Sequence, residues 1–189
     1  MNLPNKLTIL RIILIPVYVV FFLIPFTRWN YLIATGVFIV ASITDYLDGH
    51  LARKNNLVTN FGKFADPLAD KLLVCSALVC FVSEGMMPAW VCIIIIAREL
   101  AIGGLRLVCV EKGVVVAASN WGKAKTVSQM VFIIMTSLNV SYYLIFALPA
   151  VCLIFDIVRQ VVMYVALILT IISLIDYFVK NKEVFKKQA

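Results

Sequence analysis

Long stretches without a charged residue constrain the fold of this chain more than any other feature. Six of them, at positions 12–27, 29–44, 72–83, 85–97, 126–155 and 160–175, cover much of its 189 residues. A helix needs about 20 predominantly apolar residues to cross a hydrocarbon core about 30 Å thick. The third and fourth stretches are shorter, so their helices must continue into charged residues that face a water-filled cavity. We therefore expect an all-α integral membrane protein with six transmembrane helices.

The distribution of Lys and Arg predicts the orientation of these helices. With six spans both chain ends lie on one side of the membrane, and that side holds all 17 basic residues except Arg28 and Arg159. Because basic loops tend to stay in the cytoplasm, we expect a multi-pass cell-membrane protein whose ends and aspartate-rich segment 45–71 face the cytoplasm. The net charge of +7 favours membrane lipid head groups or phosphates as partners. We expect no nucleic acid partner, because the basic residues flank apolar segments.

Turn and helix signals predict one domain, residues 1–189, without internal repeats. We expect helices at about 8–26, with a bend at Pro16, from 31 into the aspartate-rich segment, from there to 83, and from 88 to 110. Residues 54–60 resemble a cytoplasmic turn. A polar loop, 111–125, precedes the fifth helix. Pro149, Asp156 and Arg159 are expected to mark the connection to the sixth.

Four aspartates fall into two rows with helical spacing. The first row occupies positions i, i+3, i+4, i+7 and i+8, which share one face of a helix: Asp45, Asp48, Gly49, Ala52 and Arg53. The second row is spaced by four residues: Gly62, Asp66 and Asp70. A hairpin that joins the two rows would point four carboxylates at one place.

Four carboxylates so close together require neutralisation. At separations of about 7 Å and an effective dielectric near 20, their six pairs repel by about 10 kcal/mol in total. Protonation would lower this repulsion, as would the nearby cations of Arg53, Lys63 and Lys71. A divalent cation is the third solution, because carboxylate oxygens suit Mg²⁺, Mn²⁺ or Ca²⁺ and Mg²⁺ often binds carboxylates together with substrate phosphates. The small residues in both rows leave room for a bulky ligand, which favours the metal.

Both rows together fit the frame D-x-x-D-G-x-x-A-R, eight residues, G-x-x-x-D-x-x-x-D at every fixed position. In this the chain resembles the CDP-alcohol phosphotransferases. The resemblance implies the six-helix membrane fold of that family, a homodimer, and transfer of a phosphatidyl group from a CDP-linked lipid to an alcohol with release of CMP. It also implies that Asp45, Asp48, Asp66 and Asp70 bind Mg²⁺ or Mn²⁺, and that Asp70 is the general base.

The same resemblance suggests where the nucleotide binds. It places the cytidine diphosphate against Gly49, Ala52, Arg53 and Gly62. The opening "LPNKLTILR" is similar to one branch of the family, which makes Asn5, Thr8 and Arg11 candidates for the nucleotide site. Helix capping explains Asn5 and Thr8 almost as well.

That branch transfers the phosphatidyl group of CDP-diacylglycerol to sn-glycerol 3-phosphate, and "IIAREL", "GLR" and "GKAKTVSQ" resemble it too. Arg98 and Arg106 lie about two helical turns apart on one face, and two guanidinium groups in an apolar helix need an anionic partner. We expect them to bind the acceptor phosphate together with Lys123 and Lys125. Alternatively, Arg98 pairs with Glu99 and the lysines contact lipid head groups.

Other functions remain open at this level. Within the family, the acceptor would be inositol phosphate, serine or phosphatidylglycerol. An intramembrane prenyltransferase also binds a diphosphate through aspartates and Mg²⁺, but its acidic motifs lie far apart in sequence. A cation-coupled transporter would use the aspartates as an ion site and release no CMP.

Overall fold

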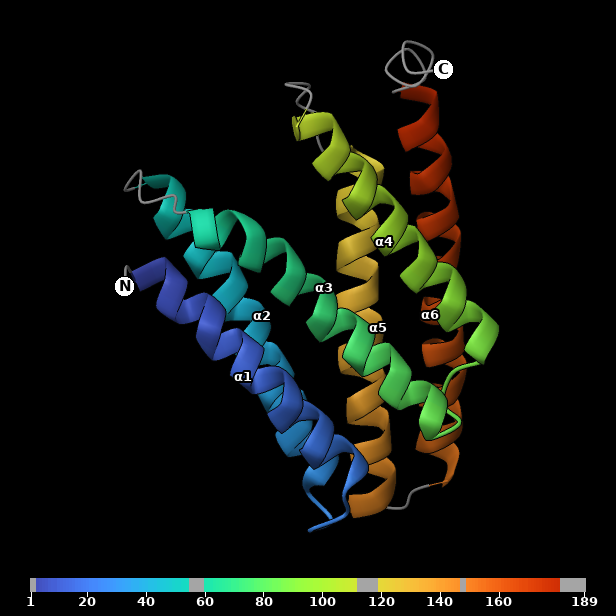
Figure 1. Ribbon diagram of the computed structural model, residues 1–189. Helices are drawn as coiled ribbons and strands as arrows, with labels where there is room; N and C mark the ends of the chain where they lie inside the picture. Colours follow the sequence, from blue (N-terminus) through green and yellow to red (C-terminus); the bar gives the residue numbers. More distant parts are fainter. Residues whose placement is uncertain (1–2, 55–59, 112–118, 147–148, 181–189) are drawn as a thin grey trace.

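The computed structural model describes residues 3–54, 60–111, 119–146 and 149–180 (Figure 1). The described residues form six α-helices, in agreement with the six apolar stretches: α1 Leu3–Leu23, α2 Asn30–Lys54, α3 Asn60–Ser83, α4 Ala89–Glu111, α5 Asn120–Phe146 and α6 Pro149–Lys180. Side chains at positions 46–54 and 60–67 lie outside the described part. The expected turn at 54–60 lies between the end of α2 and the start of α3, and its residues 55–59 are also outside that part.

Several helix boundaries differ from the expected ones. Helix α1 begins at Leu3, before Thr8, and runs through Pro16. Helix α5 begins at Asn120, so the expected loop up to Lys125 is wrong in its second half. The hydroxyl of Ser119 accepts a hydrogen bond from the N–H of Gly122 at 3.2 Å, which is the contact that caps a helix N-terminus.

The connection between α5 and α6 ends earlier in the chain than the sequence predicts. Helix α6 begins at Pro149, a position where proline's fixed φ suits the first turn. Asp156 and Arg159 therefore lie inside the helix. Asp156 accepts a hydrogen bond from the side-chain amide of Asn139 at 2.8 Å, and Arg159 donates to the backbone carbonyl of Met86. These polar residues tie α6 to α5 and to the α3–α4 connection.

The turn after α3 has the hydrogen bonds of a Schellman motif. The N–H of Met86 donates to the carbonyl of Phe81 at 2.8 Å, and that of Gly85 donates to Val82 at 3.1 Å. Gly85 has a φ of 68°, a left-handed conformation that side chains with a Cβ adopt at a cost. Pro88 lies three residues after Gly85, and α4 starts at the next residue, Ala89.

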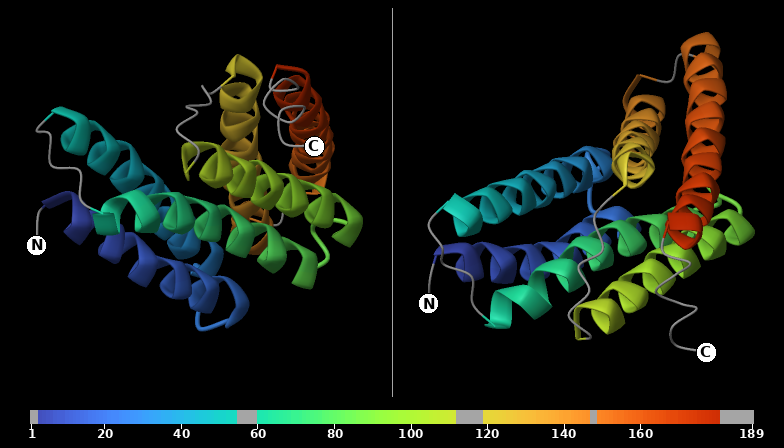
Figure 2. Two further views of the ribbon diagram at one scale, coloured as in Figure 1. Left: turned by 45° about the horizontal axis from the view of Figure 1, so that its top comes forward. Right: turned by 90° about the horizontal axis from the view of Figure 1, so that it is seen from above.

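The helices are arranged as two antiparallel pairs joined by α3 and α4. Helix α1 packs on α2 and α5 packs on α6, while α2 contacts α5, α3 contacts α1 and α4, and α4 contacts α6. The N-terminal ends of α1, α3 and α5 and the C-terminal ends of α2, α4 and α6 lie toward the same end of the bundle (Figure 1). Figure 2 shows α3 and α4 lying across one side of the two pairs. The aspartate-bearing ends of α2 and α3 thus lie near the start of α1 (Figure 2).

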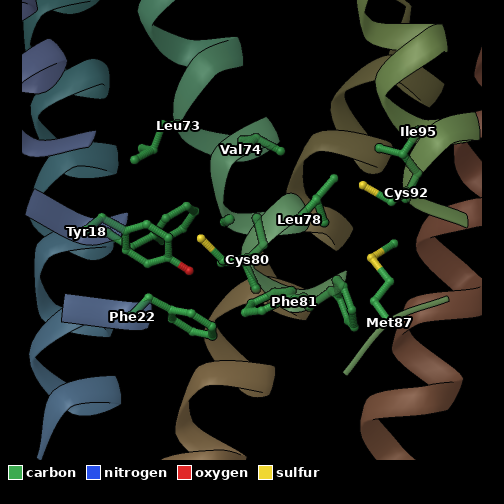
Figure 3. Close-up of a cluster of buried hydrophobic side chains, with 14 of the residues drawn as sticks. Tyr18, Phe22, Leu73, Val74, Leu78, Cys80, Phe81, Met87, Cys92 and Ile95 are labelled. Carbon is green, nitrogen blue, oxygen red and sulfur yellow. The ribbon is translucent and has the colours of Figure 1, made fainter. Parts of the chain in front are cut away.

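The middle of the bundle is filled by aromatic and aliphatic side chains. The rings of Tyr18 and Phe22 on α1 stack at 5.6 Å, and Phe22 lies 5.4 Å from Phe81 of α3 (Figure 3). Phe81 in turn meets Phe132 of α5 edge to face at 5.7 Å. Such pairs add about 1 kcal/mol each beyond the burial of their area. This core holds α1, α3 and α5 together and separates the polar groups at the two ends of the bundle.

The outer surface is strongly apolar. On α6, for example, large apolar side chains are exposed along the whole helix: Leu153, Ile157, Val161, Ile168, Ile171, Ile175 and Val179. Lys6–Leu23 in α1 and Leu153–Lys180 in α6 are long and apolar enough to cross a membrane, and Asn30–Asp45 in α2 is a shorter apolar stretch. By contrast, Gln129, Thr136, Ser137 and Thr170 are buried. An apolar exterior around a partly polar interior suits a lipid environment.

Candidate active site

Charged side chains from five helices gather toward the end of the bundle where α1, α3 and α5 begin. We call this group the charged end; its members are Arg11, Asp45, Asp70, Lys71, Arg98, Glu99 and Lys125. Each of these residues lies either in the half of its helix nearest this end or near the middle of its helix. Charges at this depth are costly unless they are paired or bind a ligand.

Arg11 of α1 forms an ion pair with Asp45 of α2. The guanidinium is fully buried, whereas the Asp45 side chain keeps 34% of its surface exposed. The arginine therefore neutralises part of the aspartate charge from inside the bundle and leaves the carboxylate accessible on its other side. Thr8, one helical turn before Arg11, is also buried.

Asp70 of α3 lies between the two halves of the charged end. Its carboxylate interacts electrostatically with Asp45 and Arg11 on one side and with Glu99 and Lys125 on the other. Among the side chains that the structure describes, none forms an ion pair with Asp70. The carboxylate is therefore free to accept a hydrogen bond from a bound molecule.

Glu99 of α4 is the anion to which two cations bind. Its Oε1 atom contacts the ammonium of Lys125 from α5 and lies 3.0 Å from Nη1 of Arg98. The guanidinium of Arg98 also donates to the hydroxyl of Ser173 on α6. Glu99 therefore pairs with Arg98 and with Lys125, which is 26 residues further along the chain.

Lys71 connects α3 to the same part of α4. Its ammonium donates to the backbone carbonyl of Glu99 at 3.1 Å. This approach is possible because position 103, one turn further along α4, is a glycine. A Cβ built on Gly103 would overlap Nζ of Lys71, whereas the space around Gly104 is open.

The predicted metal site is only partly within the described side chains. Asp45 and Asp70 come from neighbouring helices and influence each other electrostatically. The side chains of Asp48 and Asp66 lie outside the described part, and no group of three or more His, Cys, Asp or Glu that could hold a metal ion occurs among the described residues. The donors that are described are carboxylate oxygens, which fit a hard cation such as Mg²⁺ or Mn²⁺.

Most of the residues predicted for the nucleotide fall outside the described side chains, namely Asn5, Gly49, Ala52, Arg53 and Gly62. Their backbones belong to α1, α2 and α3. Because α1 begins at Leu3, Asn5 and Thr8 are inside the helix, so the capping explanation for them is wrong. The buried Thr8 shares a helix face with Arg11.

The structure separates the four predicted acceptor residues into two pairs. Arg98 and Lys125 are buried and share Glu99, so the alternative pairing of Arg98 with Glu99 is present. Arg106 and Lys123 are exposed. A Cβ built on Gly122 would lie 4.0 Å from Nη2 of Arg98, so the first turn of α5, which carries Lys123, passes beside Arg98. Arg106 acts electrostatically on Tyr177 of α6.

An apolar groove opens between α2 and α5. Its volume is about 260 Å³, and it is lined by Ile39, Ser42, Ile43, Met130 and Ile134. Ile43 precedes Asp45 by two residues, about 3 Å along the helix axis but on a nearly opposite face of α2. Ile43 is exposed and the other lining residues are half-buried, so the groove lies on the outer side of the α2–α5 contact.

Comparisons with known proteins show which sequences this chain is similar to. The profile of the family described as CDP-alcohol phosphatidyltransferase matches residues 1–172. A Bacillus subtilis protein named CDP-diacylglycerol–glycerol-3-phosphate 3-phosphatidyltransferase is 45% identical over 98% of this chain and 97% of its own length. Proteins of the same name from Rickettsia bellii and Haemophilus influenzae are 38% and 40% identical, over 97% and 93% of this chain and 97% and 91% of their own.

Proposed function

Because this chain belongs to the CDP-alcohol phosphatidyltransferase family, we propose that it transfers the phosphatidyl group of CDP-diacylglycerol to sn-glycerol 3-phosphate. The products are phosphatidylglycerophosphate and CMP. The full-length similarity to relatives named for this reaction supports the choice of acceptor. The observation that carries the proposal is that Asp70 interacts electrostatically both with the Arg11–Asp45 pair and with Glu99 and Lys125. We assign the first group to the donor and the cluster of Arg98, Glu99 and Lys125 to the acceptor.

Each substrate has a role in the proposed reaction. The hydroxyl oxygen of glycerol 3-phosphate attacks the phosphorus of the phosphatidyl group and forms a new P–O bond. The bond from that phosphorus to the bridging oxygen breaks, and CMP leaves with the oxygen and its electron pair. Asp70 accepts the proton of the attacking hydroxyl. Its location beside both halves of the charged end suits it to this step, because proximity and orientation supply much of the rate enhancement.

Members of the family generally use a divalent metal ion, and we propose Mg²⁺ or Mn²⁺ held by Asp45, Asp48, Asp66 and Asp70. When bound, the ion would offset the negative charge of the diphosphate. Arg11 holds Asp45 in place through an ion pair whose guanidinium is buried. Gly49, Ala52, Arg53 and Gly62, with Asn5 and Thr8 from α1, are proposed to receive the cytidine diphosphate.

The acceptor phosphate is proposed to bind Arg98 and Lys125, with Arg106 and Lys123 closing the pocket from the exposed side. Phosphate oxygens accept charge-assisted hydrogen bonds from guanidinium and ammonium groups. The first turn of α5 beside Arg98 supports the inclusion of Lys123.

We further propose that all six helices cross the cell membrane and that the charged end faces the cytoplasm, where glycerol 3-phosphate is dissolved. The apolar exterior of the bundle and the alternating direction of its helices support this topology. The α2–α5 groove is proposed to take an acyl chain of the donor, because its lining is largely apolar and it lies on the helix that carries Asp45. A homodimer is the proposed assembly.

The alternatives have weaker support. The family match over residues 1–172 favours phosphatidyl transfer over a prenyltransferase or a cation-coupled transporter. Inositol phosphate, serine and phosphatidylglycerol remain the competing acceptors within the family.

Purified protein with CDP-diacylglycerol and a panel of these alcohols tests the proposal through release of CMP. We expect release with glycerol 3-phosphate, loss of release with EDTA, and recovery with Mg²⁺. Indifference to EDTA, or release that depends on another alcohol, would contradict it.

A further inference from the structure

We propose that Glu99 is a positioning residue for the acceptor: it holds Lys125 and Arg98 where the acceptor phosphate binds and keeps Lys125 from pairing with Asp70. This inference rests on the proposed function. It concerns a carboxylate that lies outside the aspartate frame.

The contacts around Glu99 involve four helices, and its carboxylate binds Lys125 of α5 and the adjacent Arg98 of α4. Its side chain is 14% exposed, that of Lys125 2% and that of Arg98 11%. Lys125 comes from α5, Arg98 continues to Ser173 of α6, and Lys71 of α3 donates to the Glu99 backbone. Because Lys125 comes from another helix, the carboxylate of Glu99 fixes the position of its ammonium relative to Arg98 and Asp70.

The charges of the cluster leave room for an anion. One carboxylate faces two cations, and Arg98 and Lys125 repel each other across it. An unpaired excess of positive charge in a largely buried place is costly. A phosphate that binds both cations would remove this excess. The cluster is therefore arranged for a ligand with negative charge and not only for joining helices.

Lys125 has two carboxylates within its electrostatic surroundings, Glu99 and Asp70. It contacts Glu99, while Asp70 has no ion pair among the described side chains. If Glu99 were neutral, Asp70 would be the remaining carboxylate able to attract the Lys125 ammonium. An ammonium on Asp70 would occupy the oxygen that must accept the hydroxyl proton. Glu99 therefore keeps the base accessible as well as positioning the phosphate ligands.

The test is a comparison of Glu99→Gln, Lys125→Gln and the double variant in the full-length protein, with CMP release as the readout. We expect Glu99→Gln to raise the KM for glycerol 3-phosphate about tenfold and to lower kcat, with the KM for CDP-diacylglycerol within about twofold of the unsubstituted protein. Glu99→Asp, which keeps the charge, should retain more activity than Glu99→Gln. Because Glu99 acts in part through Lys125, the double variant should lose less activity than the two single variants lose together.

Asp156→Asn is the matched control. Asp156 also joins helices through a carboxylate, to Asn139 and Arg159, but at the opposite end of the bundle. The Asp156→Asn variant should have a lower thermal stability and unchanged KM values for glycerol 3-phosphate and CDP-diacylglycerol. Equal changes of both KM values in Glu99→Gln, or additive effects in the double variant, would overturn the inference. If the unsubstituted protein releases no CMP with glycerol 3-phosphate, the proposed function itself fails, which is a distinct result.

Discussion

Asp70 is the residue on which the proposed chemistry depends most directly. Replacing it with Asn keeps the size of the side chain but removes its ability to take a proton. We expect Asp70→Asn to lower CMP release by a factor of about 100 or more, in line with the usual contribution of a general base. Binding of the CDP-lipid, measured separately by its effect on thermal unfolding, should largely persist. A variant with near-normal turnover would show that another group accepts the proton.

At the scale of helices, the contact between α3 and α4 depends on a glycine. An alanine at Gly103 would displace the Lys71 ammonium from the Glu99 carbonyl, whereas an alanine at Gly104 meets open space. Glycine in a helix costs about 0.5–1 kcal/mol relative to alanine. We therefore expect Gly104→Ala to raise the melting temperature in detergent.

Gly103→Ala should raise the melting temperature less, because it also removes the hydrogen bond of Lys71, which contributes about 1 kcal/mol. The two variants form a matched pair on one helix. Equal melting temperatures would mean that Lys71 is accommodated elsewhere without loss.

The groove between α2 and α5 provides a second test at this scale. Tryptophan at Ile43 would fill the groove on the outer side of α2 and α5. We expect Ile43→Trp to raise the KM for CDP-dioleoylglycerol by several-fold while hardly changing that for a short-chain analogue, since only the long chain reaches the groove. Ile168→Trp on α6 is the control, because Ile43 and Ile168 are 53% and 54% exposed. The same change at both positions would remove the groove from the donor site.

At the scale of the whole molecule, the proposed topology places the α3–α4 connection outside the cell and the start of α5 inside. Glu84 and Asn120 are both exposed, and cysteine can replace either without disturbing the charged end. A membrane-impermeant maleimide added to intact cells should label Glu84→Cys but label Asn120→Cys only after permeabilisation. The unsubstituted protein measures the background from its own cysteines. Labelling of both variants in intact cells would contradict six spans.

Several features of this protein could be predicted from its sequence because they are local. Apolar length and helical spacing are properties of single segments, and they predicted the six helices and the continuation of α2 through Asp45 toward Lys54. Local signals were weaker at helix ends. Because Ser119 caps α5, the helix begins before Lys123 and not after the predicted loop. Helix α6 begins at Pro149, where the sequence predicted the connection between α5 and α6.

The pairing of charged groups required the tertiary structure. In sequence, Arg98 has Glu99 beside it, Lys125 has no acidic neighbour, and Arg11 is 34 residues from Asp45. The helix crossings bring Lys125 to Glu99 and Arg11 to Asp45. Long side chains reach many partners, and burial determines which partner they take. The sequence thus determined which helices form and which faces carry the aspartates. Only the tertiary arrangement of α1 beside α2 and of α5 near α4 decided which cations neutralise which carboxylates, because that depends on distances between separate helices.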